Sequence, residues 1–480
     1  MQTTKNERLT MARLYGQMRR GQITRREMLR QGAVAGVGAA TLALFAGSSR
    51  PSYAFAQDST PAGQELGYSI EVPTDTSRDF EGQEITAILG SDGPGTPFEE
   101  VVVARFQEAS GIIVNRVSGP EKTDERLTQY LQLFSAQSGD ADVVMIDVID
   151  VGVVAAHAVD LSDVLESRDV EYFERIVENN TTQDKLVGIP WYTDAGLLYY
   201  RTDLLEQYGF EGPPETWDDL ENMAKTILDG EVSSNPDFQG FVFQGSSYEG
   251  LTCDALEWQA SNGGGEIVSD DGEVTLNNEQ AIAMFEKAAS WVNTIAPEGV
   301  TVYAEEDARG VWQEGNAAFM RNWPYAYSLG QAEDSNIRDK FDVTVLPMGS
   351  ADGARHAATL GGWQIMVSQY SEAQDAAKEF AKYMTSREIQ KAYAIERSLL
   401  PTIPELYSDS AVLDSNPFFE RLLDVFQNAV ARPSTPSGEL YPELSAIYYQ
   451  GVNGILTGGS DPASAVEEMA SDMESLLEEL

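Results

Sequence analysis

Aromatic rings and a carboxylate stand near the ends of the strands that this sequence predicts. Asp147 closes an apolar run, and Trp191, Trp323 and Trp363 lie beside Pro, Asn or Gly residues. Sugars present apolar C–H faces that stack on aromatic rings and hydroxyl rims that bond to carboxylates, so this combination is typical of a carbohydrate site. Core packing is the alternative for any single tryptophan, and a helix cap or a solvated acid is the alternative for Asp147.

Two further positions could contribute polar groups to such a site. Gly361 and Gly362 precede Trp363, and the lack of side chains lets the backbone approach a ligand closely. Arg432 stands directly before Pro433, which stiffens the loop and favours bidentate bonds from the guanidinium. An ordinary surface salt bridge is the alternative for this arginine.

The composition disfavours several other kinds of chemistry. Two histidines make zinc sites and Ser-His-Asp catalysis poor candidates, and one cysteine excludes an intramolecular disulfide. The glycine-rich loop 90–95 lacks the Lys-Ser/Thr ending of a phosphate loop. Carboxylates are so numerous that no pair of them indicates a glycosidase. We therefore expect no cofactor and no metal, and the composition by itself singles out no catalytic pair.

The elements that must position these residues alternate between strands and helices. A chain of 480 residues is too long for one core, so we expect at least two domains. In the first region, strands at 85–89, 111–117 and 141–147 enclose helices at 98–109 and 126–137, which predicts an α/β fold with a parallel sheet. Open parallel sheets bind ligands at the carboxyl ends of their strands, where Asp147 stands.

The second region repeats this character. Strands are expected at 186–190, 197–200, 240–244, 341–346 and 362–367, with a hairpin at 267–275. A capping box at Thr216–Asp219 predicts one helix start, Asn278 predicts another, and the chain after Ser371 is mostly helical.

The first 56 residues predict export. They carry nine Lys+Arg and two acids, followed by a short apolar run at 32–47 and an Ala-Phe-Ala cleavage site at 54–56. Arg25-Arg26 resembles a twin-arginine signal, with a general secretory signal as the alternative. No cysteine follows the apolar run, so the lipoprotein signal is missing. We expect a periplasmic or extracellular protein, possessing a membrane anchor only if the signal stays uncleaved, and a flexible linker at 57–81.

The net charge is −45 for the whole chain, from 77 Asp+Glu against 32 Lys+Arg. Without the basic export segment the remainder carries −52, which disfavours nucleic acid and anionic lipid as partners. The acidic surface suggests adaptation to salt or to solubility outside the cell.

Six stretches, read together, resemble family 1 extracellular solute-binding proteins of ABC importers, most of all their trehalose/maltose-binding branch. The stretches are Asp-Val-Val-Met-Ile-Asp (142–147), Ile-Pro-Trp-Tyr-Thr-Asp-Ala-Gly-Leu-Leu-Tyr-Tyr-Arg (189–201) with 214–217, Gly-Phe-Val-Phe-Gln (240–244) with 248–254, Gly-Asn-Ala-Ala-Phe-Met-Arg-Asn-Trp-Pro-Tyr (315–325), Ala-Thr-Leu-Gly-Gly-Trp (358–363), and Ala-Arg-Pro (431–433) with 441–445.

The resemblance implies a two-lobed periplasmic-binding-protein fold, each lobe an α/β sheet flanked by helices, with the ligand cleft between the lobes. Lobe 1 is expected at 82–192 plus 360–401, and lobe 2 at 193–359 plus 402–480. The resemblance also implies a monomer that closes over a disaccharide such as trehalose, maltose or sucrose and then docks on the transmembrane subunits of an ABC permease.

The same resemblance implies roles for particular residues. Asp147, Tyr192 and Asp194 are expected to bond sugar hydroxyls, and Trp323 and Trp363 are expected to stack on sugar rings. Gly362 is expected to approach the sugar by its backbone, and Arg432 is expected to bond it from lobe 2. The first loop is expected to supply an acid, Glu99 or the neighbouring Glu100. Where relatives tend to place an aromatic after the first stretch, this chain has Asp150.

A secreted glycoside hydrolase with a similar sugar-binding cleft is the alternative function. It requires a placed acid and a nucleophile or base, and the sequence singles out no such pair. If the implied site is right, Trp363→Ala and Arg432→Ala are each expected to weaken sugar binding while leaving the melting temperature nearly unchanged.

Overall fold

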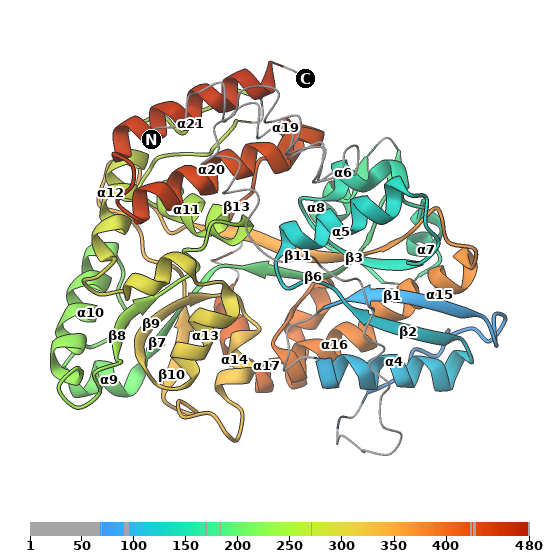
Figure 1. The fold of residues 1–480 in the computed structure, drawn as a ribbon. Helices are drawn as coiled ribbons and strands as arrows, with labels where there is room; N and C mark the ends of the chain where they lie inside the picture. Colours follow the sequence, from blue (N-terminus) through green and yellow to red (C-terminus); the bar gives the residue numbers. More distant parts are fainter. Residues whose placement is uncertain are drawn as a thin grey trace.

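The computed structural model describes residues 68, 70–90, 96–168, 170–182, 184–269, 271–422, 425 and 429–478. These residues form two α/β lobes that stand side by side, and strands β6 (Ile189–Ala195) and β11 (Ala358–Val367) run from one lobe to the other (Figure 1). The signal peptide predicted at 1–56 lies outside the described residues.

The sheet of lobe 1 has the order β12-β6-β11-β3-β1-β2, and β13 pairs with the start of β11. The strands not yet bounded are β1 (Glu84–Leu89), β2 (Ile113–Ser118), β3 (Val143–Asp147), β12 (Leu400–Pro401) and β13 (Ala429–Val430). β1 pairs in parallel with β2 and β3, which confirms the parallel arrangement expected for the first region. The long strand β11, however, runs antiparallel to both β3 and β6, so the whole sheet is mixed.

The strands of lobe 1 have continuous apolar runs because both faces of the sheet are buried. Val143 and Met145 belong to the core cluster on one side of the sheet, whereas Val144 and Ile146 belong to a second cluster on the other side. Helices cover both sides, so no face of β3 needs polar residues. The main helices of this lobe are α4 (Thr96–Ser110), α5 (Thr123–Ser135), α15 (Gln374–Met384) and α16 (Arg387–Arg397).

Lobe 2 contains a second sheet of order β10-β7-β9-β8, in which only the β8–β9 pair is parallel. Its strands are β7 (Leu197–Arg201), β8 (Gln239–Val242), β9 (Ala317–Asn322) and β10 (Phe341–Thr344). Its main helices are α10 (Trp217–Glu231), α11 (Glu249–Ser261), α12 (Glu279–Trp291), α13 (Glu305–Gln313), α20 (Tyr441–Leu456) and α21 (Pro462–Leu477).

Two predicted helix starts in lobe 2 are confirmed. Thr216 and Asp219 bond reciprocally in a capping box that begins α10, and the Asn278 side chain accepts from the backbone N–H of Ala281 at the start of α12. Each cap satisfies backbone donors that the first helical turn leaves free, an effect of about 1 kcal/mol. The hairpin expected at 267–275 is reduced to a single bridge between Val268 and Val274.

The described part of the predicted linker packs onto lobe 1 instead of extending freely. Tyr68 contacts Phe98 of α4 edge to face, with 5.0 Å between ring centroids. The Asp75 carboxylate lies 2.7 Å from Lys382 Nζ of α15, and the Ser77 N–H donates to Glu379 Oε1 at 2.7 Å. The polar composition of this segment concealed four apolar side chains that contact the lobe 1 core: Tyr68, Ile70, Val72 and Phe80.

Near position 402, where the chain is expected to return to lobe 2, residues contact the cores of both lobes, and Leu400 already belongs to the lobe 2 core cluster. Ile403 and Leu406 belong to the core cluster of lobe 1, and the Phe173 N–H donates to the Thr402 carbonyl. By contrast, Val412 and Phe418 belong to the lobe 2 core. Within the described residues, no helix combines the length and the apolar character needed to cross a bilayer.

Candidate functional site

A cleft of about 210 Å³ lies between the lobes and is lined by residues of both. All eight residues singled out in the sequence line it: Glu99, Asp147, Tyr192, Asp194, Trp323, Gly362, Trp363 and Arg432. They come from six separate elements and loops, so it is the fold and not proximity in the sequence that brings them together.

The two strands that join the lobes carry half of this set. Trp363 of β11 lies between Asp147 of β3 and Tyr192 of β6 in the antiparallel register, and Gly361 is paired with Asp194. Gly362 has a φ of +138°, and a Cβ at this position would lie 2.8 Å from the Tyr192 carbonyl oxygen. Both the backbone conformation and the close approach of β6 therefore require glycine here.

Arg432 joins the two lobes through charge. Its Nη2 lies 2.8 Å from Asp147 Oδ1 of lobe 1, and its Nη1 lies 3.0 Å from Glu249 Oε1 of lobe 2. Glu249 also accepts hydrogen bonds from the hydroxyls of Tyr441 and Ser445. Burial raises the pKa of Glu249, although Arg432 acts in the opposite direction. The arginine is 3% exposed, so the surface salt bridge considered for it is wrong.

Two of the three tryptophans that line the cleft, Trp323 and Trp363, are each in contact with a guanidinium. The Arg321 guanidinium lies 4.0 Å from the ring centroid of Trp323, and that of Arg126 lies 4.6 Å from the ring of Trp363. Cation–π contacts of this kind contribute about 0.5–2 kcal/mol and fix the plane of the ring. The planes of these two rings in the cleft are therefore fixed by neighbouring arginines.

Asp194 is the least satisfied acid in the cleft. Its side chain is 7% exposed, and its Oδ1 has no hydrogen-bond partner among the described residues. Burial raises the pKa of this carboxyl well above its usual range, and the nearby Asp147 adds to the rise. A buried oxygen without a hydrogen-bond partner lowers the stability of the fold by about 1–3 kcal/mol, so stability does not explain why an acid stands at this position.

Glu99 is held more firmly than a free ligand acid. Its Oε2 accepts from Arg116 Nε at 2.5 Å, and the same guanidinium donates to the Gly90 carbonyl. Asp150 is buried, and its Oδ2 accepts from the backbone N–H of Asp147 at 3.2 Å. Asp150 therefore stabilises the turn that follows β3.

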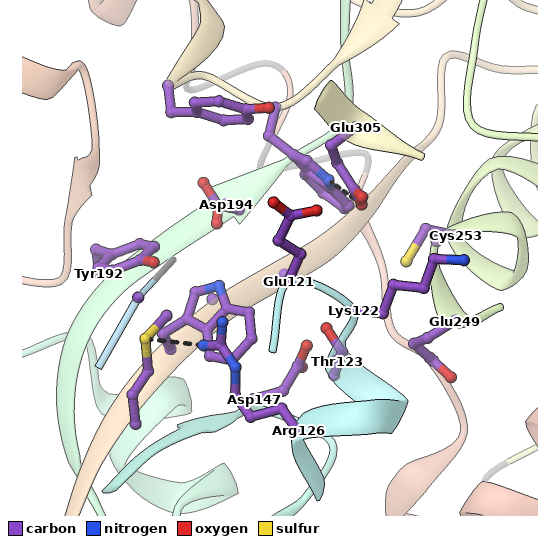
Figure 2. A pocket seen from close by; sticks show the side chains of 18 of the residues that line it. Glu121, Lys122, Thr123, Arg126, Asp147, Tyr192, Asp194, Glu249, Cys253 and Glu305 are labelled. Carbon is purple, nitrogen blue, oxygen red and sulfur yellow. Dashed lines mark hydrogen bonds between the residues drawn. The ribbon is translucent and has the colours of Figure 1, made fainter. Parts of the chain in front are cut away.

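Several lining residues escaped the sequence analysis. They form three groups, at the start of α5, on α11 and at the start of α13: Glu121, Lys122, Thr123 and Arg126; Tyr248, Glu249 and Cys253; and Glu305, Glu306 and Asp307 (Figure 2). Acids in a first helical turn usually serve the helix itself, so only the folded position of α13 distinguishes Glu305. No group of three or more His, Cys, Asp or Glu side chains in the described part of the chain is arranged to hold a metal ion.

Residues 90–391 match the family described as Bacterial extracellular solute-binding protein. The chain belongs to this family. A probable ABC transporter-binding protein of Deinococcus radiodurans is 45% identical over 82% of this chain and 94% of its own length. This solute-binding protein is thus of the ABC transporter type, and the extracellular family implies an exported protein.

The structure of maltose-bound T. maritima MalE3 superimposes on this solute-binding protein with a TM-score of 0.77. The two are 37% identical, over 82% of this chain and 99% of that one. A Thermotoga lettingae solute-binding protein bound to α-D-tagatose has a TM-score of 0.72 at 22% identity, over 82% and 100% of the two chains. The second likeness shows the fold alone, and together they confirm the two-lobed architecture predicted from the sequence.

Proposed function

We propose that this protein is the sugar-capturing subunit of an ABC importer and that its ligand is a disaccharide of the maltose or trehalose kind. The observation that carries the proposal is the lining of the interlobe cleft, which combines Trp323 and Trp363 with carboxylates and Arg432. Rings suit the C–H faces of a sugar, and the charged groups suit its hydroxyls. Similarity to maltose-bound MalE3, at 37% identity, supports a disaccharide.

Capture depends on contacts with both lobes at once. Asp147, Tyr192, Gly362 and Trp363 belong to lobe 1 or the joining strands, whereas Trp323 and Arg432 belong to lobe 2. A ligand that touches both sides favours the closed arrangement in proportion to its extra contacts there. The closed monomer is then the form that the transmembrane subunits of the permease recognise.

The N-terminal segment fits the same role. We propose that residues 1–56 direct export by the twin-arginine route, so that the lobes fold before they cross the membrane. The acidic mature chain remains soluble outside the cell.

Calorimetry of the mature protein with maltose, trehalose, sucrose and glucose tests the proposal. We expect one disaccharide to bind in a one-to-one complex and glucose to bind more weakly, because a single ring buries less surface against the cleft than two rings do. Chromatography of the mixture after prolonged incubation should recover the intact sugar. Absence of binding to all four sugars would refute a role in capturing such disaccharides, and hydrolysis at a useful rate would favour the glycoside hydrolase instead.

A further inference from the structure

The region around Trp323 contains more carboxyl groups than cations. Arg321 is paired with Asp254 at 3.0 Å and with Glu257 at 2.5 Å, and both acids are fully buried. Arg432 is likewise shared between Asp147 and Glu249. The two arginines whose charges act on Asp194 are therefore already committed to other acids.

Asp194 and Glu305 are left without an ion pair among the described residues, and both lie against Trp323. A Cβ on Gly361 would be 3.1 Å from Asp194 Cβ and 3.3 Å from Trp323 Cζ3, so the acid and the ring border the same space. Glu305 Oε1 accepts from Trp323 Nε1 at 3.4 Å, and its Oε2 accepts from the Tyr248 hydroxyl at 2.7 Å.

Glu121 approaches this space from the opposite lobe. It lies just before α5, and in Figure 2 its carboxylate points into the part of the cleft that Asp194 and Glu305 border. No salt bridge among the described residues involves Glu121. Three carboxylates from distant parts of the sequence thus lie around the edge of Trp323, and among the described residues the buried Oδ1 of Asp194 has no hydrogen-bond partner.

We propose that the Trp323 end of the cleft receives a positively charged amino group and that the preferred ligand is a saccharide bearing a protonated amine. An ammonium group has three donors and can bond to several carboxylates together, whereas a hydroxyl offers only one donor. A cation beside Asp194 would also supply the charge and the partner that this buried carboxyl lacks. A bare metal ion suits the site less well, since no described group of side chains is arranged as a metal cage.

This inference rests on the proposed function, because it names the ligand class of the same cleft. Trp363 and the remainder of the cleft would still hold a sugar ring, and the amine would add selectivity at one end. The excess of negative charge would at the same time repel anionic sugars such as uronates and sugar phosphates.

Matched ligands test the proposal directly. Calorimetry should compare trehalose with its 2-amino-2-deoxy analogue and with the N-acetylated form of that analogue, which restores neutrality while keeping the nitrogen. We expect the amine to bind at least 10-fold more tightly than both neutral ligands, and the advantage to shrink as salt is raised. The same three forms of maltose, carrying the amine on the non-reducing ring, extend the test to a second linkage.

Variants identify the charges responsible. Asp194→Asn and Glu305→Gln should each reduce the ratio of amine affinity to parent-sugar affinity by 5-fold or more. Asp218→Asn removes the same unit of charge from a side chain that is 61% exposed on α10, and it should leave the ratio unchanged.

The outcomes separate this inference from the function on which it rests. Tight binding of the neutral parent with equal or weaker binding of the amine would overturn the inference and retain the sugar-binding function. Failure of every saccharide to bind would overturn both. An amine preference that survives both cleft substitutions would overturn the assignment to the Trp323 end.

Discussion

The buried arginine between the lobes makes a quantitative prediction about stability. Arg432→Met retains much of the side-chain volume but leaves Asp147 and Glu249 without their cation. Removing one partner of a buried ion pair costs about 3–5 kcal/mol, because the remaining charge is neither solvated nor neutralised. Glu249 can relieve part of this cost by taking up a proton, so we expect a loss of about 3 kcal/mol.

For a unit the size of lobe 2, this loss corresponds to a fall of roughly 6 °C in melting temperature. The expectation replaces the unchanged melting temperature predicted for Arg432→Ala from the sequence, in which the burial of this residue is invisible. Scanning calorimetry of the mature protein without sugar provides the measurement.

Arg421→Met serves as the matched control. Arg421 pairs with Asp342 at 2.7 Å in the same lobe, but the arginine is 51% exposed, and pairs of this kind contribute only about 0–1 kcal/mol. If Arg432→Met melts within 2 °C of both the wild type and Arg421→Met, the reasoning from burial is refuted.

Three further predictions concern the cleft. Asp194→Asn should raise the melting temperature at pH 7, because the pKa of the wild-type carboxyl is raised in the folded protein and its negative charge there destabilises the fold. The increase in melting temperature should vanish near pH 3, where the carboxyl is protonated in both the folded and the unfolded chain, and a lower melting temperature at pH 7 would contradict the prediction. Gly362→Ala should destabilise the protein by about 1–3 kcal/mol in urea titrations, since its Cβ would collide with the Tyr192 carbonyl, whereas Gly212→Ala, which meets nothing within 4 Å, should be nearly neutral. Trp363→Ala should weaken disaccharide binding about 10-fold by calorimetry, and unchanged affinity would exclude stacking on this ring.

The sequence predicted the elements of lobe 1 well because their periodicity is strong. The run 141–147 is buried on both sides, as its unbroken apolar character indicates, and Asp147 does stand at its carboxyl end. The direction of β11 was not predictable in this way. An apolar strand reads the same whether its neighbours run parallel or antiparallel, and only the completed sheet shows that β11 opposes both β3 and β6.

The candidate site was predictable from the sequence where the residue types themselves indicate a ligand contact. The Gly361–Trp363 stretch combines a conformational requirement with an aromatic ring, and the structure places both in the cleft. Glu305 gave no such signal, because an acid at a helix start has an ordinary structural use. The docked segment around Tyr68 was missed because its polar majority outweighed a few anchoring side chains.

The crossing strands have a mechanical consequence for signalling. Leu360, Gly361 and Gly362 are paired in register with Ala195, Asp194 and Thr193, so the lobes are joined by a hydrogen-bonded ladder rather than by slack loops. Any rotation of the lobes must twist this ladder, and its amides should exchange with deuterium slowly whether or not a ligand is present. Because Asp194 and Trp363 both belong to this ladder and line the cleft, a molecule bound there would contact the strands that join the lobes. Ligand binding and rotation of the lobes would therefore act on the same pair of strands, without a chain of intermediate residues between them.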